Sequence, residues 1–144
     1  MGHSDTICLL QECDSGTKMA VNSIDEVLGY VKNEELKMIL TESKHHHEKL
    51  EKEILELHDK YNSEEKDPGV MATSMSWLKT NFKLAMNEND QTIAELITDG
   101  CHMGLKSLHK YMNDYTDANH DVHEICNRLI DIEEELLEDL EGYL

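Results

Sequence analysis

Two stretches of the chain resemble each other: residues 15–28, SGTKMAVNSIDEVL, and residues 99–112, DGCHMGLKSLHKYM. Aligned, they match five pairs of core positions: Gly16 with Gly100, Met19 with Met103, Ala20 with Gly104, Ser23 with Ser107 and Ile24 with Leu108. Any two amphipathic helices align in phase, but phase alone does not require glycine, methionine and serine to recur at the same positions. The match therefore predicts an internal repeat.

The similarity continues into the next helix of each half after a shift of two residues. The matched pairs there are Leu36 with Val122, Ile39 with Ile125, Ser43 with Leu129, His46 with Ile132, His47 with Glu133, and Leu50 with Leu136. Each half is therefore expected to form one helical hairpin. The small residues at matched positions predict that the first and third helices approach each other closely.

Four segments carry apolar residues at helical spacing, namely residues 4–31, 34–61, 91–115 and 122–144. Asn33 is expected to cap the second helix, and Asn87 or Asn89 the third. A shorter helix is predicted in the long connection between the second and third helices, with one face made by Met71, Met75, Leu78, Phe82 and Ala85. One proline and seven glycines agree with an all-α fold.

Length and charge limit the classes of function. The 144 residues are enough for one domain, taken here as residues 1–144. With 13 basic and 31 acidic residues, the formal charge is −18, which disfavours binding to nucleic acid and to anionic membrane surfaces. No apolar run is long enough to span a membrane, and no signal-peptide pattern stands at the start. We therefore expect a cytoplasmic protein whose four scattered cysteines are reduced core residues.

The order of hairpin, long connection and hairpin resembles the ferritin-like superfamily, and in particular its small bacterial members of unknown function. The segments ECDSGTKM and LITDGCHMGLKSLHKYM look like the first-helix and third-helix signatures of that group, and the resemblance covers nearly the whole chain. It implies a four-helix bundle with one crossover connection. It also implies a metal-binding protein of stress or storage type.

The di-iron members of that superfamily use inward-pointing glutamates and Glu-x-x-His pairs. One literal match occurs here, Glu42-Ser43-Lys44-His45, in the stretch TESKHHHEKLE. Helical phase places His45 on the outer face, and it predicts that His46 and His47 face the bundle. The repeat-related positions of Glu42 and His45 are Arg128 and Asp131, so a complete di-iron site is not expected.

A smaller metal site remains open. Glu42 and His46 are four residues apart on one helix, and His47 and Glu133 are expected to face each other across the core. These four side chains offer nitrogen and oxygen donors suited to a single iron, zinc or nickel ion. In the alternative, His46 and His47 are histidines at the edge of the core that form hydrogen bonds with Glu42, Glu133 or Ser43.

Two functions follow from these alternatives. The first is a ferritin-like metal-binding protein with a reduced site, and the second is a metal-free structural or protein-interaction bundle. The sequence contains no phosphate-binding loop, no G-x-S-x-G turn and no dinucleotide-binding glycine pattern, and no histidine is expected at the level of Cys13 and Asp14. An enzyme is therefore not the favoured prediction. A homodimer formed through an exposed apolar strip is expected in either case.

Overall fold

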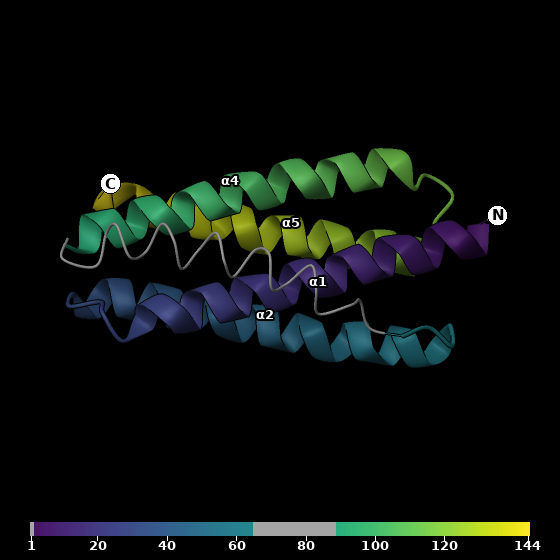
Figure 1. The fold of residues 1–144 in the computed structure, drawn as a ribbon, viewed down its shortest axis with the longest axis horizontal. Helices are drawn as coiled ribbons and strands as arrows, with labels where there is room; N and C mark the ends of the chain where they lie inside the picture. The colour runs from purple at the N-terminus through teal and green to yellow at the C-terminus, as the bar shows by residue number, and fades with distance from the viewer. Residues whose placement is uncertain (1, 65–88) are drawn as a thin grey trace.

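The computed structural model describes residues 2–64 and 89–144. These residues form four α-helices and no strand: α1 (Gly2–Leu28), α2 (Glu34–Lys60), α4 (Asp90–Asp114) and α5 (His120–Leu140). A 3₁₀ helix, η1 (Glu141–Tyr143), follows α5, so the predicted fourth helix ends before the last residues. Figure 1 shows the four helices lying side by side as a bundle. The predicted all-α class and four-helix bundle are confirmed. The predicted connecting helix lies outside the described residues.

Local sequence explains where the helices begin. The side chain of Asn33 accepts a hydrogen bond from the backbone N–H of Leu36, 3.0 Å away, and thereby caps α2. Asn89 caps α4 in the same way, through the N–H of Thr92. Glu34 and Glu35 occupy the first turn of α2, where negative charge is favoured by the helix dipole. Both predicted caps are confirmed.

Polar contacts at the two ends of the bundle define the directions of the helices. At one end, the carboxylate of Asp90 accepts hydrogen bonds from the backbone N–H groups of Lys32 (2.9 Å) and Asn33 (2.8 Å). At the other end, Tyr61 donates a hydrogen bond to Asp121, at the start of α5. The start of α2 thus lies beside the start of α4, and these two helices run in the same direction, as Figure 1 also shows.

The core has two apolar halves with a polar layer between them. One half contains Ile24, Leu36, Leu40, Ile97 and Leu136, among others, and the other is built around residues such as Leu9, Leu50, Ile54, Val122 and Leu129. Between them lie four buried polar residues from α1, α2 and α5: Thr17, Ser43, His47 and Glu133. The sequence predicted only the α2 and α5 part of this layer.

The predicted inner face of α4 is wrong in its middle. Met103 is 54% exposed and Ser107 is exposed, whereas Cys101 and Leu108 are buried. The buried face passes through Cys101 instead of Gly100. Because successive residues of an α-helix are about 100° apart, the true buried face is rotated by about that angle from the predicted one. A Cβ atom added at Gly100 or Gly104 would meet nothing within 4 Å in the described part of the chain, so close packing against described residues does not explain these two glycines.

The other core predictions have mixed outcomes. Cys13, Cys101 and Cys126 are free and buried, as expected, and Cys8 is partly buried. A Cβ atom added at Gly16 would lie 3.7 Å from a methyl group of Leu129 in α5, which is an ordinary van der Waals contact. None of the helices in the described part of the chain has the length and apolar character needed to cross a membrane.

Candidate functional site

A buried polar contact of the central layer joins α2 to α5. Nε2 of His47 lies 2.8 Å from Oε1 of Glu133, and Nδ1 of the same ring lies 2.7 Å from the backbone carbonyl oxygen of Ser43. The His47 side chain is completely buried, and Glu133 is only 7% exposed. The structure thus brings together two of the four predicted ligands.

The partners of His47 determine where its protons lie. The carbonyl oxygen of Ser43 has only lone pairs to offer, so Nδ1 must carry a proton and donate it. Nε2 and the Glu133 carboxylate would then both present lone pairs. They would repel each other unless a proton or another cation lies between them. At 2.8 Å, the separation is that of a hydrogen bond, with one proton on Nε2 or on the carboxyl group.

Cys101 of α4 is the third titratable group at this level. Burial, with the negative charge of Glu133 and a hydrogen bond to it, raises the pKa of the Cys101 thiol well above its ordinary value. The thiol therefore stays protonated at neutral pH. Sequence reasoning expected Cys101 to be a reduced core residue, but it did not place it in the central layer because it put Gly100 on the buried face.

Glu42 and His46 do not join the central layer. Both side chains are exposed, so the prediction that His46 faces the bundle is wrong. The buried positions of α2 form a narrow stripe that includes Ser43, His47 and Leu50, and His46 lies about 80° from the middle of that stripe. His45 is on the outer face, as predicted, with a side chain that is 70% exposed.

Glu42 and His46 instead contribute to a small surface depression between α2 and α5. Its other lining residues are Ile39 and Ser43 of α2, and Ile132, Glu135, Leu136 and Asp139 of α5. The four predicted ligands are therefore divided between two places: His47 and Glu133 in the core, Glu42 and His46 on the surface. Within residues 2–64 and 89–144, as placed, no group of three or more His, Cys, Asp or Glu side chains is arranged to hold a metal ion.

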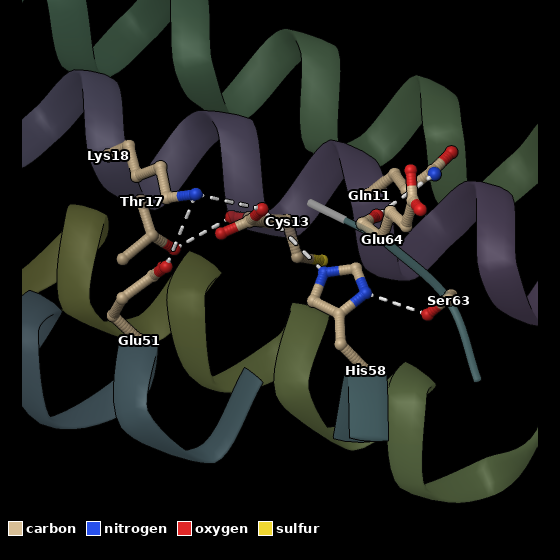
Figure 2. A network of polar contacts seen from close by, with 9 residues as sticks. Gln11, Cys13, Thr17, Lys18, Glu51, His58, Ser63 and Glu64 are labelled. Carbon is tan, nitrogen blue, oxygen red and sulfur yellow. Dashed lines mark hydrogen bonds and ion pairs between the residues drawn. The ribbon is translucent and has the colours of Figure 1, made fainter. Parts of the chain in front are cut away.

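A second buried polar network lies between α1 and the end of α2. The Asp14 side chain is completely buried, and its Oδ2 lies 3.2 Å from Nζ of Lys18 and 3.6 Å from Nε2 of His58. Nδ1 of His58 lies 2.7 Å from the hydroxyl of Ser63 (Figure 2). A histidine thus lies at the level of Asp14, contrary to the sequence-based expectation. The signal that was missed is the spacing of His58, four residues after the core residue Ile54.

The Ser63 contact belongs to the end of a helix. Asn62 has a φ of 53°, in the left-handed region, and the N–H of Ser63 donates to the carbonyl of His58 at 2.9 Å. These are the features of a helix C-terminal cap, in which a left-handed residue reverses the chain and the following N–H satisfies a free carbonyl. The contact between the Ser63 hydroxyl and the His58 imidazole is therefore explained by the capping of α2.

We compared the chain with known proteins, and it matches no protein-family model, no curated protein and no solved structure.

Proposed function

We propose that this chain is a non-catalytic structural or protein-interaction bundle of ferritin-like arrangement, with a histidine–glutamate pair at its centre in place of a metal centre. The observation that carries the proposal is the pairing of His47: both of its ring nitrogens are engaged by groups of the chain itself. Because Glu42 and His46 are on the surface, the central layer has too few donors for the metal chemistry that the resemblance implies.

The distance between the paired atoms favours a proton as the bridging cation. A tetrahedral zinc ion with ordinary bonds to nitrogen and oxygen would hold its two ligand atoms about 3.4 Å apart. The separation between Nε2 of His47 and Oε1 of Glu133 is 2.8 Å. Binding an ion here would require the two helices or side chains to separate and the shared proton to leave.

The ferritin-like arrangement is supported by the directions of the helices and by the repeat. Helices α2 and α4 run in the same direction, as in a bundle of two hairpins joined by one crossover. Burial also recurs at matched positions, because Leu9 and Ile93, Cys13 and Ile97, Leu40 and Cys126, and Leu50 and Leu136 are all buried. His47 and Glu133 are themselves a matched pair and contact each other, as expected for equivalent residues at a two-fold axis.

The second candidate function is a ferritin-like metal-binding protein that takes up iron or zinc at the same layer. One observation favours it: the hydrogen bond from Nδ1 of His47 to the Ser43 carbonyl holds the ring in the way that metal-binding histidines are commonly held. Cys101 would add a sulfur donor from a third helix. In this case the Cys101 thiol would lose its proton, and the proton shared by His47 and Glu133 would leave, when the ion binds.

Metal titration of the full chain separates the two candidates. The protein is purified without metal-affinity resin, treated with a chelator, and titrated with Zn²⁺ or Fe²⁺ while bound metal and melting temperature are followed. If the centre holds a proton, His47→Gln and Glu133→Gln lower the melting temperature equally with and without metal. If the centre binds metal, the ion raises the melting temperature of the wild type, and both variants lose that increase.

Interaction with a second copy is the simplest form of the interaction function, and we propose a cytoplasmic homodimer. The formal charge of −18 makes like copies repel each other. Dimerisation should therefore strengthen with salt, and sedimentation at low and high ionic strength measures it. A chain that stays monomeric at both salt concentrations contradicts the dimer and leaves binding to a basic partner protein as the form of the interaction function.

A further inference from the structure

The surface depression between α2 and α5 has the composition of a cation site. Four of its eight lining residues carry donors that bind divalent ions: Glu42 and His46 from α2, Glu135 and Asp139 from α5. Each pair is separated by four residues, so its two side chains lie next to each other on one helix face. No lysine or arginine is among the lining residues. The mutual repulsion of three carboxylates therefore favours a positive ion between the helices.

Ser43 supplies an independent sign of a ligand. It lines the depression, it is 6% exposed, and its hydroxyl oxygen is buried without a hydrogen-bond partner among the described residues. A buried hydroxyl without a partner is costly, and most such groups in proteins are satisfied. An ion, or a water bound to it, in the depression would provide the missing partner.

The size of the site and the exposure of its side chains agree with a single ion. The depression has a volume of about 10 Å³, which suits one atom or one water molecule. Glu42, His46, Glu135 and Asp139 are exposed, so their side chains are free to rotate toward a common point between the helices. This rotation is required, because as placed they do not form a group that holds a metal.

We propose that this depression is a binding site for one divalent transition-metal ion, held by Glu42, His46, Glu135 and Asp139, with Ser43 at its floor. The imidazole of His46 selects a borderline ion such as Zn²⁺ over Mg²⁺ and Ca²⁺, which prefer all-oxygen sites. The ion would fasten α2 to α5 on the outside of the bundle. The proposal goes beyond the interaction function and does not depend on it, since the central pair stays intact.

Calorimetric titration of the chelator-treated full chain with Zn²⁺ tests the site. We expect one ion per chain, and we expect His46→Ala and Asp139→Asn each to weaken binding by at least about tenfold. His45→Ala is the matched control, because it removes a neighbouring histidine from the outer face of the same helix and should leave the affinity unchanged. His47→Gln should also keep the affinity, which separates this site from an ion in the core.

Ser43→Ala tests the floor of the site. If Ser43 serves the ion, the variant binds Zn²⁺ more weakly while its melting temperature without metal is equal to or above that of the wild type. If Ser43 only fills space, the affinity does not change, and the role given to its hydroxyl is wrong. The site itself is overturned by an absence of saturable binding, by binding that survives both His46→Ala and Asp139→Asn, or by equal losses with His45→Ala.

Discussion

His47 of α2 and Glu133 of α5 share a hydrogen bond of 2.8 Å in the middle of the bundle, where an apolar half of the core begins on either side. In this contact the His47 ring and the Glu133 carboxyl group each satisfy the buried polar group of the other. The contact also couples the two hairpins at a point that water does not reach. Substitutions at His47 and Glu133 should therefore have coupled, non-additive effects on the free energy of unfolding.

Replacing one member of this pair should lower the free energy of unfolding more than replacing both. His47→Leu alone leaves the Glu133 carboxylate buried without its partner, and we expect a loss of about 3–5 kcal/mol in the free energy of unfolding. The double variant His47→Leu with Glu133→Leu should recover most of that loss, because two apolar side chains can pack there. Urea unfolding of the two single variants and the double variant measures the coupling, and losses that simply add would contradict it.

Asp121 should make stability depend on acid pH. Burial opposes ionisation of its carboxyl group, but hydrogen bonds from Lys60 and Tyr61 outweigh burial and lower the pKa of Asp121 below its ordinary value. Because the folded pKa is the lower one, this contribution is present above about pH 4 and is lost as pH falls through the folded pKa. Asp121→Asn should thus be less stable than the wild type at pH 7, and the difference should shrink toward pH 2. A difference independent of pH would contradict this.

The Cys101 thiol should make the protein less stable as pH rises into the alkaline range. Burial and Glu133 raise the pKa of its thiol, so the folded protein keeps this proton when the unfolded chain loses it, above about pH 8.5. The unfolded state then binds fewer protons, and stability falls as pH rises. The stability advantage of the wild type over Cys101→Ala should therefore shrink, or reverse, between pH 7 and pH 10 in urea unfolding.

Thiol reagents should label the partly exposed Cys8 first.

Asp90 should contribute to docking of the second hairpin. Its carboxylate accepts hydrogen bonds from two backbone N–H groups in the turn between α1 and α2. By analogy with helix caps, Asp90→Ala should cost about 1–2 kcal/mol. Glu95→Ala, at an exposed position of the same helix, is the control and should change stability by less than about 0.5 kcal/mol. Equal effects of the two substitutions would show that the Asp90 contacts contribute nothing.

The parts of the fold that sequence predicted correctly are those where apolar spacing is unambiguous. On α2, the positions Leu36, Leu40, Leu50 and Ile54 follow one another at helical intervals and are all buried. The caps at Asn33 and Asn89 were also predictable, because an asparagine stands just before each helix. In these places the type of each residue correctly predicts whether it is buried or caps a helix.

The errors arose where residue type says little about position. Cys101 stands between Gly100 and His102 in a stretch of small and polar residues, so periodicity could not separate the true face of α4 from the neighbouring one. His46 and His47 are identical in type, and only the narrowness of the buried stripe on α2 separates them. His58 lies four residues after the buried Ile54, but because histidine is polar this spacing was not read as a core position. Three-dimensional packing decides each of these cases.

The contacts at the two ends of the bundle also restrict how the length of the protein can change. Asp90 meets the turn before α2, Asp121 meets the end of α2, and the 27-residue helix between them is about 40 Å long. An insertion of one turn in α2 alone would separate one of these contacts, whereas equal insertions in all four helices would keep both. Relatives of this chain should therefore lengthen or shorten all their helices together.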